Sequence, residues 1–192
     1  MNQLSAFRLS MVALFAALNA GVGFIVQLLK LPIYLDLIGS VLAVVLLGPV
    51  YGIAVAVLGI ILLGLLTVPT AFAYVGTAVV VTLFAYVFHK YGYLKKWPQT
   101  IAFGLVLGII SAVMSAPVTV YLFGGISFVG ADAATAFFRA TGKTIFNSVF
   151  LGGLATDPVD KVLLSIICFV LIQRLPERLK ERLSTSNDVG AR

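Results

Sequence analysis

The stretch that decides the fold is LIGSVLAVVLLGPVYGIAVAVLGIILLGLLTVPTAFAYVGTAVVVTLFAYVF, residues 37–88, which contains no Asp, Glu, Lys, Arg or His. A helix crosses the hydrocarbon core of a bilayer with about 20 residues, so this stretch is too long for one crossing and must fold back. Proline lacks an amide hydrogen and breaks a helix, which places the breaks at Gly48-Pro49 and at Thr67-Val68-Pro69-Thr70. The stretch therefore predicts three consecutive helices, at residues 37–47, 50–66 and 71–88.

The composition agrees with a membrane protein. Apolar residues make up 61% of the 192-residue chain and charged residues 10%, with a mean hydropathy of +1.12. Soluble domains carry about a quarter charged residues, so this chain has too few to cover a water-facing surface. Three more apolar runs predict helices at residues 9–29, at 101–123 and from Pro158 to about Ile172. We therefore expect an all-α polytopic membrane protein with six transmembrane helices, forming a single domain over 1–192, with a flexible basic tail at about 176–192.

The positions of Lys and Arg predict the orientation, because short cytoplasmic loops carry the excess of both. With the N-terminus inside, the cytoplasmic side holds Arg8, Lys90, Lys95, Lys96, Arg174, Arg178, Lys180, Arg182 and Arg192. The outer side holds only Lys30, Arg139 and Lys143, with Lys161 just inside the last helix. We expect both termini in the cytoplasm and a multi-pass protein of the bacterial plasma membrane. The net charge of +6 then reflects topology, and we predict no nucleic-acid partner.

The sequence offers few groups for metal or nucleotide chemistry. A single cysteine, Cys168, and a single histidine, His89, exclude a thiolate cluster and multi-histidine ligation. The segment Gly142-Lys143-Thr144 resembles the end of a phosphate-binding loop, but Phe137 stands where that loop needs a glycine. We predict no metal, no cofactor and no catalytic residue, so any ATP energy must come from a partner.

The outer loop at residues 124–158 carries the first candidate site. Thr135, Arg139, Lys143 and Asn147 recur every four residues and share one helical face, which predicts an amphipathic helix. One interpretation is an interfacial helix whose cations contact lipid phosphates. The other is that Arg139, Lys143 and Asn147 line an outward-facing pocket and hydrogen-bond a polar ligand.

The segment Asp157-Pro158-Val159-Asp160-Lys161 is typical of a helix start, with Asp157 as the N-cap and Pro158 in the first helical position. Lys161 does not fit this pattern, because a cation in the first turn opposes the helix dipole. We expect Lys161 either to pair with Asp157 or to present its ammonium group to the pocket.

The connection between the first two helices contains a second candidate site. Asp36 heads a helix too short to span the membrane, where an acid is costly unless it is capped, paired or functional. As an N-cap it would need no ligand. Tyr34 and Tyr74 are candidates for the aromatic belt at the membrane surface, and both flank the same outer mouth, where they could stack on a ring.

Small residues predict docking faces, because they let helices approach closely in lipid. One stripe on the fifth helix consists of Gly104, Gly108, Ser111 and Ser115. Two more on the first helix are Ala13 with Ala17, and Ala16 with Ala20. Each stripe contacts either another helix of the same chain or an outside partner.

Several segments resemble one family. Ala13-Leu14-Phe15-Ala16-Ala17 is similar to the AxxxA docking motif in the substrate-binding S components of energy-coupling factor (ECF) vitamin transporters. The chain length and the six predicted helices agree with these proteins. Further segments resemble theirs, at residues 31–36, 47–52 and 157–161.

The resemblance implies a subunit that binds a water-soluble vitamin or precursor at its outer face, closed by loops at residues 30–36, 67–74 and 124–156. It also implies docking through Ala13 and Ala17 onto a transmembrane T subunit that joins two cytoplasmic ATPase subunits, and import by toppling in the bilayer. We favour the pyridoxine or hydroxymethylpyrimidine branch, with cobalamin, pantothenate and other vitamins open.

The candidate ligand-binding residues are Tyr34, Asp36, Tyr74, Arg139, Lys143, Asn147, Asp157 and Lys161. Two other classes of function stay open at this point. The first is a membrane scaffold or channel subunit. The second is an intramembrane enzyme with Asp157 and Asp160 as a dyad.

Overall fold

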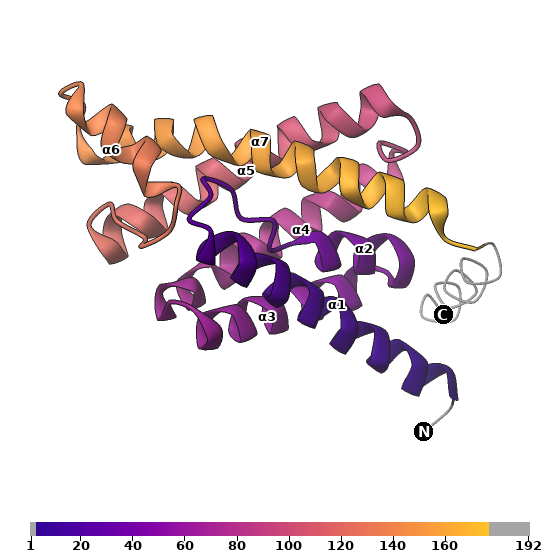
Figure 1. The fold of residues 1–192 in the computed structure, drawn as a ribbon. Helices are drawn as coiled ribbons and strands as arrows, with labels where there is room; N and C mark the ends of the chain where they lie inside the picture. The colour runs from indigo at the N-terminus through magenta and orange to yellow at the C-terminus, as the bar shows by residue number, and fades with distance from the viewer. Residues whose placement is uncertain (1–2, 177–192) are drawn as a thin grey trace.

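The computed structural model describes residues 3–176, and every regular element in that range is a helix (Figure 1). This confirms the predicted all-α class. The elements are α1 (Gln3–Leu28), α2 (Ile38–Leu47), α3 (Pro49–Leu66), the 3-10 helix η1 (Pro69–Tyr74), α4 (Val75–Lys90), α5 (Trp97–Phe123), α6 (Asp132–Ala140) and α7 (Ile145–Arg174). Residues 177–192 of the predicted tail lie outside the described part of the chain.

Four described segments are long and apolar enough to cross a membrane, namely Ala6–Leu28, Pro49–Leu66, Pro69–Lys90 and Trp97–Phe123. Their outward faces expose large apolar side chains such as Leu65 and Val113, as contact with lipid requires. These features support a membrane-embedded protein. The six crossings and their orientation stay a prediction, since the ten residues of α2 span only about 15 Å.

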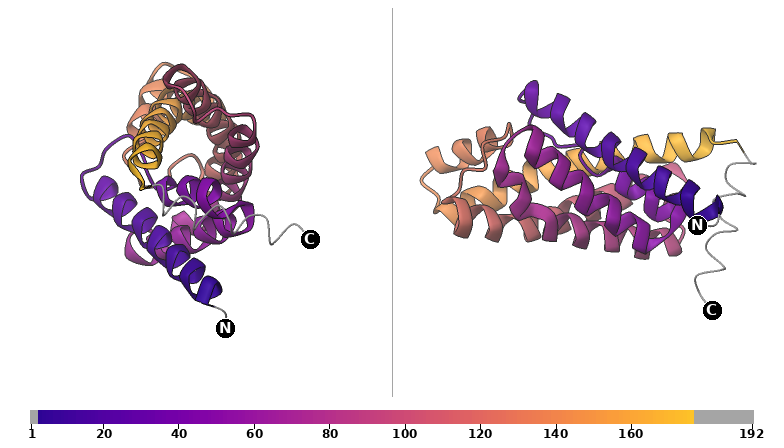
Figure 2. Two further views of the ribbon diagram at one scale, coloured as in Figure 1. Left: turned by 90° about the vertical axis from the view of Figure 1, so that its right-hand side faces the viewer. Right: turned by 90° about the horizontal axis from the view of Figure 1, so that it is seen from below.

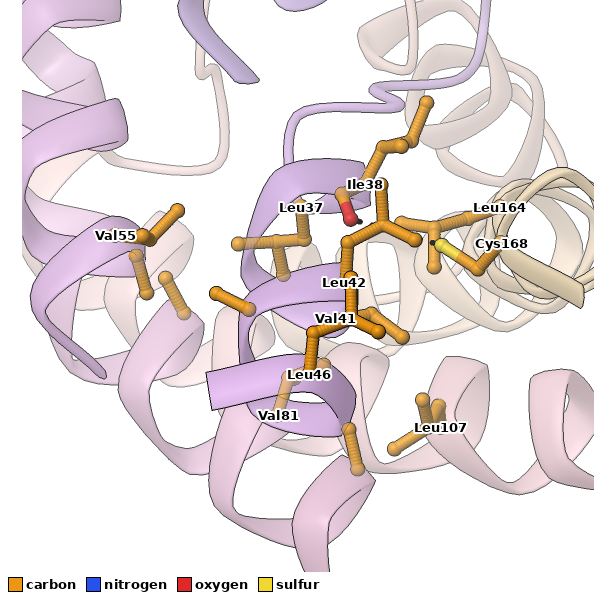
Figure 3. Close-up of a cluster of buried hydrophobic side chains, with 14 of the residues drawn as sticks. Leu37, Ile38, Val41, Leu42, Leu46, Val55, Val81, Leu107, Leu164 and Cys168 are labelled. Atoms are coloured by element: carbon orange, nitrogen blue, oxygen red, sulfur yellow. Dashed lines mark hydrogen bonds between the residues drawn. The ribbon is translucent and has the colours of Figure 1, made fainter. Parts of the chain in front are cut away.

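The short helix α2 forms the centre of the hydrophobic core, and nearly all of its residues are buried. Helices α1, α3, α4 and α7 pack around it. Figure 3 shows Val41 and Leu42 of α2 close to Leu164 and Cys168 of α7, and the Cys168 thiol donates to the Ile38 carbonyl at 3.6 Å. In lipid, where no transfer from water drives helices together, close van der Waals packing of these side chains holds the core.

The turn between α2 and α3 consists of Gly48, whose φ of 96° lies in the left-handed region that favours glycine. Pro49 follows in the first position of α3. The predicted helix break at Gly48-Pro49 is confirmed, and it lets α3 pack back along α2.

The small-residue stripe of α5 packs against α7 within the chain. A Cβ atom at Gly104 would lie 2.7 Å from the Lys161 carbonyl oxygen, and one at Gly108 would lie 2.7 Å from the Asp157 carbonyl oxygen. Only glycine permits this approach, so the predicted docking face is an intramolecular one. The contact places residues 157–161 of α7 directly against α5.

The start of the last helix differs from the prediction. Helix α7 begins at Ile145, and Thr144 is its N-cap, because its hydroxyl oxygen accepts a hydrogen bond from the Asn147 amide at 3.3 Å. Asp157 and Pro158 therefore lie inside α7, and the prediction that they start a helix was wrong. An Asp-Pro pair has the same local chemistry at the start of a helix and within one. Here α7 continues through Pro158, at the place where it packs against Gly108 of α5.

The predicted common face of Arg139, Lys143 and Asn147 was also wrong. Helix α6 ends at Ala140 and α7 begins at Ile145, so Lys143 lies in the connection and Asn147 in a different helix from Arg139. The first turn of α1 and the last turn of α7 lie at one end of the molecule, and α6 lies at the other (Figure 2).

Candidate functional site

Three connections that are far apart in the sequence come together in space. The Thr70 hydroxyl in η1 donates to the Ser127 carbonyl in the α5–α6 connection at 3.1 Å. Gly130 of the same connection lies against Leu31, in the α1–α2 connection, so closely that a Cβ atom would overlap the Leu31 carbonyl. The three loops implied by the family resemblance are thus neighbours in this fold.

A cavity of about 90 Å³ lies beneath these connections. Ligand pockets in proteins usually measure about 300–1,000 Å³, so a cavity of this size admits only a small ligand. Apolar side chains form one part of its lining, including Leu37, which precedes α2, Ile60 and Leu63 of α3, and Ala78 of α4. Its polar lining includes Tyr34, Asp36, Tyr74, Thr77, Ser111, Ser115, Thr119, Asp132, Thr156, Asp157 and Lys161.

A buried ion pair in α7 fixes one of the connections. Asp160 and Lys161 form this pair, and their side chains are 0% and 3% exposed. The other carboxylate oxygen of Asp160 accepts hydrogen bonds from the backbone amides of Tyr34 at 2.9 Å and Leu35 at 2.7 Å. Leu35 has a φ of 52°, an uncommon value for a leucine. Asp160 thus attaches the α1–α2 connection to α7.

Two tyrosine side chains reach the cavity from different connections. The Lys161 ammonium lies 5.8 Å from the centre of the Tyr34 ring, within the range of a cation–π contact. The Tyr74 hydroxyl is 2.8 Å from the Thr119 hydroxyl, and its ring packs 6.1 Å from that of Phe123. Burial raises the pKa of the Tyr34 phenol well above its ordinary value, and the Asp157 charge adds to this, so Tyr34 stays neutral at physiological pH.

Three carboxylates in the cavity lining, those of Asp36, Asp132 and Asp157, have no ion-pair partner in the described part of the chain. Asp157 is only 2% exposed, and the Thr156 hydroxyl donates to it at 3.4 Å. Asp36 does not cap α2, because Leu37 is the N-cap residue and no side chain caps this helix. Burial raises the pKa of Asp36 above its ordinary value, and the Lys161 charge opposes the shift.

Asp132, which the sequence analysis did not select, shapes the α5–α6 connection. Its carboxylate accepts hydrogen bonds from the backbone amides of Ser127 at 3.0 Å, Phe128 at 2.7 Å and Val129 at 3.3 Å, and from the Ser127 hydroxyl at 2.7 Å. Its position in the first turn of α6 is the usual place for an acid, and this was the available signal in the sequence.

The predicted ligand-binding residues divide into two groups. Five of them line the cavity, and these are Tyr34, Asp36, Tyr74, Asp157 and Lys161. Three are exposed and lie outside the cavity lining, and these are Arg139, Lys143 and Asn147. The sequence analysis missed Thr77, and it considered Asp160 only as part of a catalytic dyad, whereas its observed role depends on contacts with the distant Tyr34 and Leu35.

The alanines of α1 lie on two different faces. Ala16 and Ala20 are 1% and 3% exposed and pack inside the chain, whereas Ala13 and Ala17 are exposed. Of the two predicted stripes on α1, only the Ala13–Ala17 stripe is therefore available to an outside helix.

Within residues 3–176 no group of three or more His, Cys, Asp or Glu side chains is arranged to hold a metal ion. Comparisons of the chain with models of protein families, with curated proteins and with solved structures gave no match. The functional interpretation therefore depends on the geometry of the cavity and on the resemblance in sequence.

Proposed function

We propose that this protein is the membrane-embedded substrate-binding subunit, of the ECF S-component type, for uptake of a water-soluble vitamin or vitamin precursor. The observation that carries the proposal is the cavity, where tyrosine, hydroxyl and charged side chains converge beneath three packed connections. Enclosed pockets with an apolar lining and a few placed polar groups are the usual sites of small ligands.

The size of the cavity favours pyridoxine or hydroxymethylpyrimidine among the vitamins and precursors. A cavity of about 90 Å³ favours a compound with a single ring over larger molecules such as cobalamin. Tyr34 and Tyr74 offer faces for an aromatic ring, while Ser111 and Ser115 offer hydroxyl groups to ring substituents.

The exposed stripe of α1 supports a role for a partner helix. Ala13 and Ala17 lie one turn apart on an exposed face, and small side chains allow close helix packing in lipid. In the proposal they contact a transmembrane T subunit, and two cytoplasmic ATPase subunits supply the energy. The proposed subunit crosses the bacterial plasma membrane six times with both termini in the cytoplasm.

Titration calorimetry on the purified chain in detergent tests the binding function. Pyridoxine, hydroxymethylpyrimidine, pantothenate and cobalamin are each titrated without ATP and without partner subunits. We expect tight binding of one small-ring compound, because the cavity is already formed in the isolated chain. Equally weak heat signals for every compound would contradict the proposal.

A tryptophan scan of α1 tests the partner function. Ala13→Trp or Ala17→Trp should keep ligand affinity within about threefold of wild type but abolish ATP-dependent uptake and copurification with the T subunit, because bulk holds the partner helix away. Ile25→Trp, at an exposed position farther along α1, is the matched control and should retain uptake. Loss of ligand binding together with a lower melting temperature in the alanine variants would contradict docking through this face.

A further inference from the structure

The charges that face the cavity are predominantly acidic. The sequence pattern predicts a pocket lined by Arg139 and Lys143, but both lie outside the cavity lining. The charged side chains in the lining are Asp36, Asp132, Asp157 and Lys161. The cavity therefore carries a net negative charge, whereas the sequence pattern predicted positive side chains around it.

Two of these four charges already have close partners. Lys161 is paired with Asp160, and Asp132 accepts three backbone amides and a hydroxyl. Asp36 and Asp157 remain, and neither makes an ion pair in the described part of the chain. Lys161 supplies the only cation among the described lining residues, and its charge, besides pairing with Asp160, also acts on Asp36. One ammonium group against three lining carboxylates leaves an excess of negative charge, so the cavity favours an incoming positive charge.

An independent observation also points to a ligand. Thr77 belongs to the cavity lining and is 8% exposed, and its hydroxyl group has no hydrogen-bond partner among the described residues. Buried hydroxyl groups almost always have a partner, because leaving one unsatisfied costs free energy. A polar substituent of a bound molecule would supply the missing partner.

We propose that the cavity binds a small organic monocation, with its protonated amine near Asp36 and Asp157 and a polar substituent hydrogen-bonded to Thr77. This inference rests on the proposed binding function and narrows its substrate class. An anionic ligand would be repelled by the two carboxylates, and a neutral one would leave them uncompensated. The aromatic rings of Tyr34 and Tyr74 favour a cation on a ring over a bare inorganic ion.

Matched ligand pairs test the charge directly. Pyridoxine is compared with pyridoxamine, and hydroxymethylpyrimidine with its aminomethyl analogue, so that a hydroxyl is replaced by an ammonium group of similar size. In titrations of the full-length purified protein at neutral pH, we expect the amine of a pair to bind at least about tenfold more tightly, as charge-assisted hydrogen bonds are the stronger ones.

Two aspartate variants and one control variant test which side chains cause the preference for the amine. Asp157→Asn and Asp36→Asn should each reduce the preference for the amine to about threefold or less, since the amide keeps the shape but removes the charge. Lys143→Gln changes an exposed charge outside the cavity and should leave the preference unchanged. Melting temperatures show that each variant is folded, and the partly exposed Asp36 provides the test if Asp157→Asn does not fold.

The possible results distinguish a wrong ligand charge from a wrong substrate-binding function. Tighter binding of the hydroxymethyl members, or a preference for the amine that survives both aspartate substitutions, would overturn the cationic ligand while leaving the binding function intact. Failure of every member of both pairs to bind would overturn both.

Discussion

Two charged segments in the last third of the chain have opposite environments. Residues 157–161 lie inside α7, where Asp157, Asp160 and Lys161 are all buried. The segment from Arg139 to Asn147 spans the end of α6 and the start of α7, and its charged side chains are exposed. The difference comes from a neighbour, because Gly104 and Gly108 let α5 pack over the first segment. Whether a charged side chain of this protein is buried or exposed therefore depends on whether another helix packs against its segment.

The largest expected difference between the two segments is in stability. Lys161→Ala removes the only cation from the buried pair and should lower the free energy of unfolding by about 3–5 kcal/mol, because Asp160 is left charged and buried. Lys143→Ala removes an exposed cation and should change it by no more than about 0.5 kcal/mol. Thermal unfolding in the same detergent compares them, and equal melting temperatures would contradict the contrast.

A smaller, local effect is expected on the α1–α2 connection, whose backbone amides donate to the Asp160 carboxylate. Asp160→Ala removes the acceptor of the Tyr34 and Leu35 amides, so their hydrogen exchange should rise by at least about tenfold. Asp132→Ala is the matched control and should accelerate exchange at residues 127–129 instead. Unchanged exchange at Tyr34 and Leu35 in the first variant would show that Asp160 does not anchor the α1–α2 connection.

Two buried hydroxyl groups of α4, one in the cavity lining and one outside it, should differ in their effect on ligand binding. Thr77→Val should stabilise the empty protein by about 1 kcal/mol, since an unsatisfied buried hydroxyl is removed, and should weaken ligand binding by a similar amount. Thr82 lies on the same helix and is also buried without a hydrogen-bond partner, but it does not line the cavity. Thr82→Val should therefore stabilise without changing affinity. Equal effects of the two variants on binding would argue against a ligand at Thr77.

The smallest effects are expected at the exposed segment. Arg139→Ala, Lys143→Ala and Asn147→Ala should each change ligand affinity by less than about twofold, because their side chains lie outside the cavity lining. Titration of each variant with the best-binding compound provides the measurement. A tenfold loss in any of them would mean that the connection folds over the ligand and that the sequence-based expectation applies.

The sequence was informative where composition and proline positions dominate. The all-α class followed from the apolar composition, and the break at Gly48-Pro49 and the approximate bounds of α2, α3 and α4 followed from one long apolar stretch with two prolines. The α5 stripe also predicted a packing face, because small residues in lipid have few other uses. These features depend on local chemistry that one segment contains by itself.

The errors arose where tertiary contacts overrule local signals. Asp157-Pro158 has the chemistry of a helix start, yet the packing of α5 extends α7 through it. The four-residue spacing from Arg139 to Asn147 suggested one helix, but Thr144 caps a new one. Asp160 acts on amides of Tyr34 and Leu35, and no pattern in a single sequence pairs segments that far apart.

Native mass spectrometry of the purified chain shows directly whether the cavity holds a small ligand. Wild type is compared with Ser115→Phe, which adds a ring to the cavity lining, and with Val113→Phe, which adds the same ring to the exposed face of α5. The account predicts a bound molecule with the mass of one substituted ring on wild type and on Val113→Phe, and none on a folded Ser115→Phe. The same adduct on all three proteins would place the ligand elsewhere and contradict the account.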